Sequence, residues 1–242
     1  MGSQIEPIQS DPGEVVALRF PLRPRRDRLI AAIAHVVAQD GYRAASVSKI
    51  VAVAGVSRNS FYEHFANKEE CFLAAYDEAV EQVMARVRSA TSTARSRRDA
   101  LEAGFGAFLG YAADEPELAW LCIVEVLAAG PRALARRDEA MRRFAAFLEE
   151  GRGDDPSDVP PVLTEVIVGG VYEVIYARIL NRETATLPEL LPDVLYVWLA
   201  PFVGAARATA VRSAAAGRLS LADASGGSVI ALNPESRRTG GT

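Results

Sequence analysis

Apolar residues in the first half of this chain recur at intervals of three and four positions, the spacing that lines up one face of an α-helix. The first such stripe consists of Leu29, Ile33, Val36 and Val37. It stops at Asp40 and Gly41, where glycine suits the left-handed turn that closes many helices. The pattern predicts a first helix over residues 25–39.

Two short helices and one long helix are predicted to follow. Ser46 and Ser57 stand where a hydroxyl can cap the first turn of a helix, and Gly55 lies between them as a turn residue. Asn67 and Glu70 have the spacing of a capping box. The long helix that they open carries one apolar stripe, made of Phe72, Tyr76, Ala79, Val83 and Val87.

The rest of the chain is also predicted to be helical. Further helical segments span residues 101–112, 116–130, 132–150, 162–181 and 188–212. Pro201 to Gly204 is expected to kink or end the last of them. No segment alternates apolar and polar residues over the length of a strand, so the predicted fold class is all-α. Residues 1–22 and 213–242 lack apolar periodicity and are expected to be a mobile arm and a disordered tail.

Length and composition exclude several kinds of protein. Half of the 242 residues are apolar, but no uncharged run reaches the roughly 18 residues that a membrane span needs. The first residues are acidic and polar, unlike a secretion signal. Cys71 and Cys122 stand alone, so neither a disulfide framework nor a metal site is expected, and no cofactor is expected. These features predict a cytoplasmic protein with no membrane partner.

Charge is distributed unevenly along the chain. The net charge is −4, yet residues 19–68 carry nine basic and three acidic side chains, a net +6. Residues 69–242 carry 18 basic and 25 acidic side chains. A basic segment joined to an acidic remainder is typical of a protein of which one end meets a polyanion. Chance clustering on a solvated helix face gives the same count, so charge alone leaves DNA binding open.

A helix-turn-helix motif is the most informative feature of the sequence. Two short helices are joined through Ala-Gly-Val-Ser at 54–57, an arrangement in which the second helix enters the major groove of DNA. With Phe-Tyr-Glu-His-Phe at 61–65 and Asn-Lys-Glu at 67–69, the set resembles the N-terminal domain of the TetR family of bacterial transcriptional regulators. The resemblance implies a DNA-binding domain over residues 23–68 and a larger helical effector-binding and dimerisation domain over residues 69–212.

The resemblance also implies which side chains meet DNA. Base contacts are expected from the start of the third helix, at Ser57, Arg58 and Asn59, because arginine suits guanine and asparagine suits adenine. Phosphate contacts are expected from Ser46, Ser60, Tyr62, His64 and Lys68, with further base or phosphate contacts from Ser48 and Lys49. For His64 and Lys68 the alternative is an ordinary exposed side chain. Phe61 and Phe65 are expected to be core residues that orient the third helix.

Three further features bear on DNA recognition. The basic arm over residues 19–28 can reach a minor groove, although that role varies within the family. Val51 stands where the family usually has a small alanine, so the second and third helices are expected to lie slightly further apart. Asn59 replaces a residue that is often Gly, Pro or basic, which leaves the operator sequence open.

The resemblance places an effector pocket among the middle helices. The candidate lining residues are Phe105, Phe108, Tyr111, Trp120, Glu125, Met141, Phe144, Phe147, Tyr172 and Tyr176. Only about a third of them are expected to touch a ligand, because aromatic stripes at helical spacing are mostly core packing. Glu125 interrupts an apolar run, where an unpaired carboxylate is costly. It is expected to pair with an arginine, cap the pocket or face solvent.

Dimerisation is implied for the last two long segments, 162–181 and 188–212, as a four-helix bundle with a second copy. The first of them is apolar nearly all round, and Gly169 and Gly170 allow close helix approach. Burial inside a single chain would explain an all-round apolar helix equally well.

The sequence therefore predicts a homodimeric transcriptional repressor, released from a palindromic double-stranded DNA operator by a small, mainly apolar effector. An enzyme is the first alternative. However, the sequence has no Gly-rich phosphate loop, readable pair of catalytic carboxylates or nucleophile elbow, and no enzymatic activity is expected. A helical adaptor without a DNA role is the second alternative. Binding to duplex DNA that weakens steeply with salt separates it from a DNA reader.

Overall fold

One long and two short helices come first in the computed structural model, which describes residues 24–152, 160 and 162–224. They are α2 (Arg25–Ala44), α3 (Val47–Ala54) and α4 (Arg58–His64). The predicted caps form: Ser46 Oγ accepts from the Lys49 amide at 3.3 Å, and Ser57 Oγ accepts from the Ser60 amide at 3.1 Å. Gly55 has a left-handed backbone with φ 61° and ψ 40°, so the predicted turn between the two short helices is confirmed.

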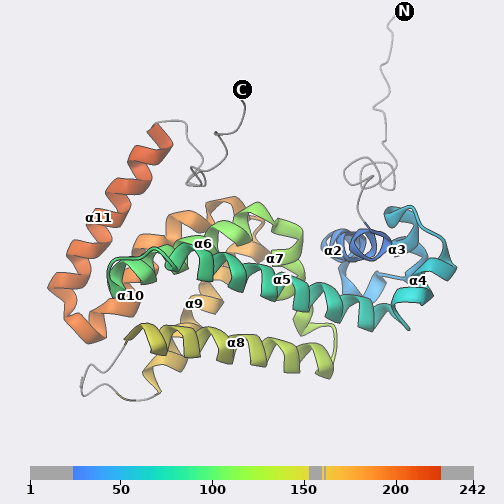
Figure 1. Cartoon of the computed structure of the whole chain (residues 1–242), viewed down its shortest axis with the longest axis horizontal. Coiled ribbons are helices and arrows are strands. Elements are labelled where there is room, and N and C mark those ends of the chain that lie inside the picture. The colour runs from blue at the N-terminus through green and yellow to red at the C-terminus, as the bar shows by residue number, and fades with distance from the viewer. Residues whose placement is uncertain (1–23, 153–159, 161, 225–242) are drawn as a thin grey trace, which may run out of the picture.

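A larger set of helices follows, with no strand among the described residues. Its elements are α5 (Lys68–Thr91), α6 (Arg97–Asp114), α7 (Pro116–Ile123), the 3-10 turn η1 (Glu125–Leu127), α8 (Pro131–Arg152), α9 (Leu163–Leu180), η2 (Thr184–Leu190), α10 (Leu191–Val203) and α11 (Ala205–Ala224). Figure 1 shows α5 running from the end formed by α2, α3 and α4 into the centre of the larger domain. The predicted all-α class is confirmed.

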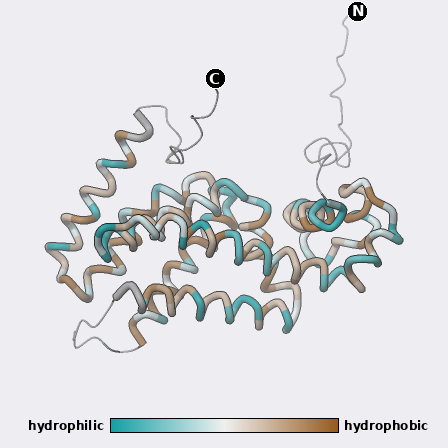
Figure 2. The backbone as a smooth tube through the Cα atoms, in the orientation of Figure 1, coloured by the Kyte–Doolittle hydropathy of each residue, from teal (hydrophilic) through white to brown (hydrophobic). Residues whose placement is uncertain are grey.

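Helix α5 connects the two parts of the molecule. Asn67 Oδ1 accepts from the Glu70 amide at 3.0 Å, and Glu70 Oε2 accepts from the Ala66 amide at 3.1 Å, so both side chains cap the first turn. The whole predicted apolar stripe of this helix is buried. Figure 2 shows hydrophobic and hydrophilic positions alternating along the helices at helical spacing.

The C-terminal end of the fold differs from the sequence prediction. The expected break is present, because α10 ends at Val203 and Gly204 has φ 82° and ψ 153°. The expected disordered tail from residue 213 is wrong in its first part, since α11 continues to Ala224. This segment is rich in alanine, the best helix former, and Arg212 and Arg218 pair with acids of other helices. Residues 1–23 and 225–242 lie outside the described residues.

Membrane-span criteria are not met by any single helix in the described part of the chain. The pair Pro116–Leu127 and Pro131–Glu149 passes on length and composition when taken together, but it is bent by 118° at its break.

Two glycines near the C-terminus allow a matched test of this end of the fold. A Cβ would meet no atom within 4 Å at Gly204 or at Gly217, but only Gly204 has a positive φ. Gly204→Ala is expected to destabilise the protein by about 1–2 kcal/mol through backbone strain. Gly217→Ala, inside α11, is expected to stabilise it by about 0.5–1 kcal/mol through chain entropy. Urea unfolding followed by circular dichroism measures both, and a loss of stability in Gly217→Ala contradicts a helix at this position.

Candidate nucleic-acid interface and cavity

The turn between α3 and α4 is held by a side chain from α2. Arg28 Nη2 donates to the Ala54 carbonyl at 2.5 Å and to the Gly55 carbonyl at 2.9 Å. These are carbonyls at the C-terminal end of α3 that the helix itself leaves unpaired. Arg28 was expected in a basic arm that can reach DNA, but its guanidinium binds carbonyls inside the protein. Its place one residue before the buried Leu29 was the only available signal.

The start of α4 presents the expected base-reading residues. Ser57, Arg58 and Asn59 are all exposed. The Arg58 guanidinium lies 5.9 Å from the centre of the Tyr62 ring, and its Nη2 lies 3.5 Å from the Tyr62 hydroxyl oxygen. On the opposite face, Phe61 and Phe65 are buried, as predicted. Two aromatic anchors therefore fix α4 while its outer face stays open.

The expected phosphate contacts fall into two groups. Ser46, Ser48, Tyr62 and His64 are exposed. Both lysines are already engaged within the protein. Lys49 Nζ lies 2.6 Å from Asp40 Oδ2, and Lys68 Nζ donates to the carbonyls of Tyr42 and Ala45 at 2.8 and 2.9 Å.

Lys68 therefore has a structural role that the sequence did not reveal. Its ammonium joins the C-terminal end of α2 to the start of α3 and lies 4.3 Å from the centre of the Tyr42 ring. Burial lowers the pKa of Lys68. Two of its three N–H donors are occupied, and one is left for a phosphate.

Ser60 is not available to DNA, contrary to the sequence expectation. Its side chain is 4% exposed and its hydroxyl has no hydrogen-bond partner among the described residues. The reason is helical geometry: Ser60 directly precedes the buried Phe61 and lies on the inner face of α4.

Ser60→Ala tests this placement. Removing a buried hydroxyl that lacks a partner is expected to stabilise the protein by about 1 kcal/mol and to leave affinity for duplex DNA unchanged. Thermal or urea unfolding measures the first effect and a fluorescence anisotropy titration the second. A more than twofold loss of DNA affinity, with stability unchanged, returns Ser60 to the interface.

A two-chambered apolar cavity lies within the larger domain. The empty space is about 770 Å³ in the first chamber and about 670 Å³ in the second, part of it open to solvent. Six residues line both chambers, namely Phe108, Ile123, Met141, Phe144, Tyr172 and Ile175. Seven of the ten expected residues lie on the wall, since Phe105 and Phe147 line the first chamber and Tyr111 lines the second.

Trp120, Glu125 and Tyr176 do not line either chamber. On α7 the cavity is lined by Leu118, Ala119, Cys122 and Ile123. A step of one residue turns a helical side chain by about 100°, so Trp120 projects from another face of the helix. Trp120 Nε1 donates to Glu125 Oε1 at 3.3 Å, and Glu125 lies against α2. The three options for Glu125 missed this contact with the backbone of the DNA-binding domain.

Among the described residues that line the cavity, Arg137 alone is charged. It was not among the residues expected from the sequence. Its Nε donates to the Tyr172 hydroxyl at 3.2 Å, and its guanidinium lies 4.5 Å from the centre of the Tyr172 ring. The Tyr172 hydroxyl donates in turn to the carbonyl of Ile123 at 3.0 Å. Burial raises the pKa of Tyr172 and of the Cys122 thiol, so both meet the cavity as neutral groups.

Exposed apolar residues lie along α9, beside the exposed acids Glu165 and Glu173. Val162, the residue directly before the helix, is 56% exposed, Val166 is 61% exposed and Val174 is 48% exposed. Gly169 and Gly170 are also exposed, and a Cβ built at either position would meet no atom within 4 Å.

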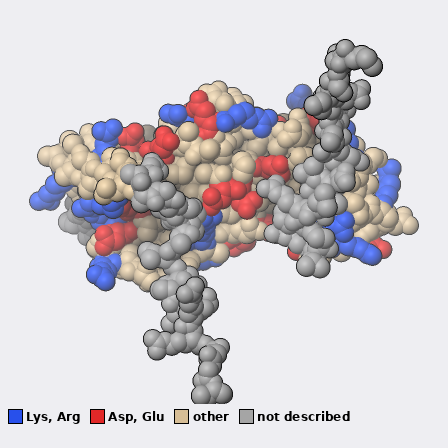
Figure 3. Space-filling view, turned by 90° about the horizontal axis from the view of Figure 1, so that it is seen from above, with Lys and Arg blue, Asp and Glu red and all other residues tan. Residues whose placement is uncertain are grey.

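Figure 3 shows basic side chains at the end of the molecule formed by α2 to α4, and mixed charges along the larger domain.

These features define the class of protein. The protein has an exposed recognition helix on two buried aromatic anchors, and one long helix joins it to a domain with an apolar cavity. This is the architecture of a DNA-binding transcriptional regulator of the helix-turn-helix type. Residues 29–75 match the sequence model of the bacterial regulatory proteins of the tetR family. The match covers the DNA-binding part of the chain, which is similar to this family.

Several known proteins are similar to this chain. The transcriptional activator FasR of Mycolicibacterium smegmatis is 36% identical over 93 residues, which are 38% of this chain and only 42% of that protein. The fatty acid degradation regulator FadR of Bacillus halodurans has a TM-score of 0.66 at 22% identity, over 75% of this chain and 96% of that one. FadR of Bacillus subtilis, solved in complex with stearoyl-CoA, has a TM-score of 0.64 at 20% identity, over 74% and 98% of the two chains.

Proposed function

We propose that this chain is a homodimeric repressor that leaves a palindromic operator when a long-chain fatty acyl compound enters its cavity. The observation that carries the proposal is the presence, on one chain, of an exposed recognition helix and an apolar cavity joined through α5. A cavity with this almost entirely apolar lining suits a ligand that is mainly hydrocarbon. The similarity to FadR, which was solved with stearoyl-CoA, supports this class of ligand.

DNA reading is assigned to α4 in this proposal. Arg58 and Asn59 face base edges in the major groove, and Tyr62, His64, Ser46 and Ser48 face the backbone on either side. Lys49 and Lys68 add charge from behind the reading surface. The six exposed residues project from α4 and from the first turn of α3, so a single groove can accommodate them.

Dimerisation through α9 is supported by its exposed apolar residues. Isolated exposed valines are ordinary on a protein surface, but here Val166, Val174 and two glycines are exposed on one helix, with Val162 directly before it. Exposed Val197 and Val203 on α10 extend the apolar surface. A second copy related by a twofold axis covers such a self-complementary patch and places two recognition helices on successive half-sites.

The polar end of the ligand is assigned to Arg137. It lies at the wall of an otherwise apolar second chamber, and its guanidinium suits a carboxylate, thioester or phosphate oxygen. The effector shifts a population: it has to bind the conformation that fits DNA poorly more tightly than the one that fits it well. FasR is named an activator, so a reporter with the operator placed at different positions relative to the promoter decides between repression and activation.

Selection of bound duplexes from a random pool tests the DNA-binding part of the proposal. The enriched sequences are expected to form an inverted repeat, because a twofold dimer reads two half-sites. Arg58→Ala is expected to relax one base position in each half-site, at a cost of about 1–3 kcal/mol for the preferred base. Asymmetric sites, or an unchanged preference in Arg58→Ala, contradict the assignment.

Filling the cavity tests the effector part. Met141 lines both chambers, so Met141→Trp is expected to raise the stearoyl-CoA concentration needed for operator release at least tenfold, or about 1.4 kcal/mol. Operator affinity without ligand is expected to change by less than about twofold, or 0.4 kcal/mol. Leu134→Trp is the matched control, because Leu134 is exposed on the same helix and lines neither chamber. An equal effect of both substitutions, or none of either, rules out ligand binding at this cavity.

A further inference from the structure

Glu125 holds the backbone of the DNA-binding domain from within the larger domain. Its Oε2 accepts a hydrogen bond from the Tyr42 amide at 2.7 Å, and its Oε1 accepts one from Trp120 Nε1 at 3.3 Å. The Tyr42 amide follows Gly41, which has φ 78° and ψ 156° and interrupts α2. This conformation is open mainly to glycine, and it leaves the Tyr42 amide outside the hydrogen-bond ladder of the helix.

Arg182, the second residue after α9, contacts the same end of α2. Its Nη2 donates to the Ala38 carbonyl at 3.0 Å, and its guanidinium lies 3.7 Å from the centre of the Trp120 ring. Arg182 has φ 62°, and it is the residue other than glycine with a positive φ in the described part of the chain. Glycine or asparagine normally occupies such a position at the end of a helix. An arginine here retains backbone strain, and its side-chain contacts with α2 and Trp120 offset that strain.

We propose that Glu125, Trp120 and Arg182 form an interdomain clasp that sets the position of the helix-turn-helix relative to the effector domain. The clasp binds the Tyr42 amide as a donor and the Ala38 carbonyl as an acceptor, so two hydrogen bonds of opposite direction hold the end of α2. Glu125 and Arg182 are positioning residues, because they act on DNA through Tyr42 and Ala38 and do not themselves face the groove.

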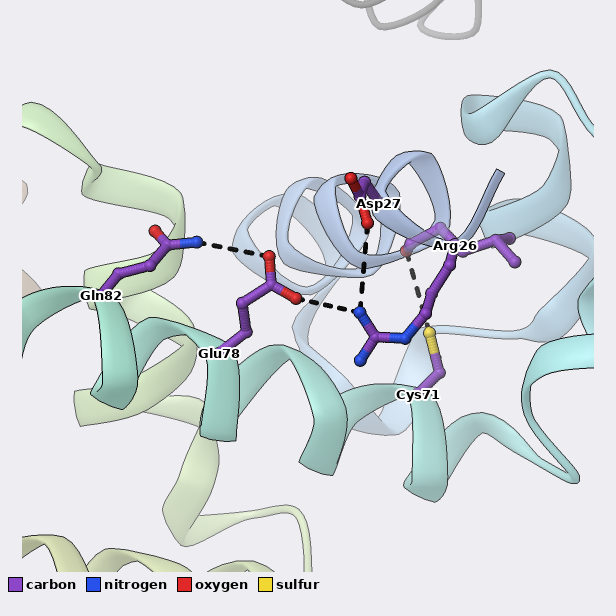
Figure 4. Close-up of polar contacts among 6 residues, drawn as sticks. Arg26, Asp27, Cys71, Glu78 and Gln82 are labelled. Atoms are coloured by element: carbon purple, nitrogen blue, oxygen red, sulfur yellow. Dashed lines mark hydrogen bonds and ion pairs between the residues drawn. The ribbon is translucent and has the colours of Figure 1, made fainter. Parts of the chain in front are cut away.

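The end of α2 that the clasp holds leads directly into the reading helices. Lys68 donates to the carbonyls of Tyr42 and Ala45, and Ser46 caps α3. A displacement at Tyr42 is therefore transmitted to the start of α3. The other end of α2 is fixed to α5: Figure 4 shows Arg26 paired with Glu78, at 3.1 Å, beside the contact between Cys71 Sγ and the backbone.

Helix α7 contributes to both the clasp and the cavity, and η1 follows it directly. Ala119, Cys122 and Ile123 of α7 line the chambers, whereas Trp120 of α7 and Glu125 of η1 belong to the clasp. The Tyr172 hydroxyl also binds the carbonyl of Ile123, two residues before Glu125. A molecule that displaces the inner face of α7 consequently displaces the carboxylate that holds Tyr42. The link to ligand entry rests on the proposed function, but the positioning of α2 does not.

Substitutions of one acidic and one basic residue test the clasp. Glu189→Gln, at an exposed position of η2, is the control. Glu125→Gln keeps the shape but sets an amide donor against one of the two N–H groups. Arg182→Gly removes the contacts and relieves the backbone strain. Both are expected to weaken operator binding at least fivefold in the absence of ligand, with an unchanged salt slope. The amide of Tyr42 is expected to exchange with solvent at least tenfold faster in Glu125→Gln, measured by NMR.

The sign of the two effects separates the clasp from simple electrostatics. If the charges act only through their field on DNA, Glu125→Gln strengthens binding and Arg182→Gly weakens it, and this pattern overturns the proposal. Wild-type affinity and Tyr42 protection in both variants overturn it too. Thermal unfolding within a few degrees of wild type, as for Glu189→Gln, excludes a folding defect as the cause.

Repeating the operator titrations with stearoyl-CoA measures the coupling between ligand binding and operator binding. The ratio of operator affinities without and with stearoyl-CoA is expected to fall at least threefold in both variants. A wild-type protein that does not respond to stearoyl-CoA defeats the effector proposal, while the ligand-free measurements still decide whether the clasp positions α2.

Discussion

Burial of α2 between the two parts of the molecule is the constraint on which the rest of the structure depends. Leu29, Ile33 and Val37 are fully buried, and the apolar cluster around them continues from Phe61 of α4 to Leu121 of α7 and Val126 of η1. The reading helices therefore do not form an independent core joined by a linker. Since packed interiors respond to changes of a single methylene, a shift of α7 or η1 cannot leave α2 unaffected. Hydrophobic burial thus makes the helix-turn-helix mechanically part of the domain that holds the cavity.

The same burial creates a demand for polar partners at the C-terminal end of α2. Gly41 interrupts this helix, so neighbouring amides and carbonyls need partners from elsewhere, and a buried group without one costs about 1–3 kcal/mol. Glu125 and Arg182 come from the larger domain, whereas Lys68 comes from the first turn of α5. Three separate segments therefore converge on one helix end. Because hydrogen bonds are directional, these partners fix the orientation of the end of α2 more closely than apolar packing alone would.

Helix positions, caps and the turn at Gly55 were predictable from the sequence, because each depends on residues close together in the chain. Seven of the ten residues expected from the family resemblance line the cavity, but Trp120 does not, because a step of one residue along a helix turns a side chain by about 100°. Ser60 was misassigned for the same reason on α4. Arg28, Arg182 and Lys68 donate to backbone carbonyls far away in sequence, and no local pattern marks such partners. Residues 213–224 of α11 were missed because alanine provides helix propensity without a strong apolar pattern.

The larger domain both holds α2 in place and encloses a cavity, and its two sides are packed differently. The side that faces α2 is tightly packed, whereas the side between α5 and α8 borders the second chamber. Three ion pairs join these two helices, Arg132 with Glu69, Arg136 with Asp77 and Arg143 with Glu81. Exposed pairs of this kind contribute about 0–1 kcal/mol each, less than burying one large apolar side chain, about 1.5–3 kcal/mol. Part of the α5–α8 contact therefore consists of interactions that cost little to break. For the ligand proposed above, opening along this wall would leave the core around α2 in place.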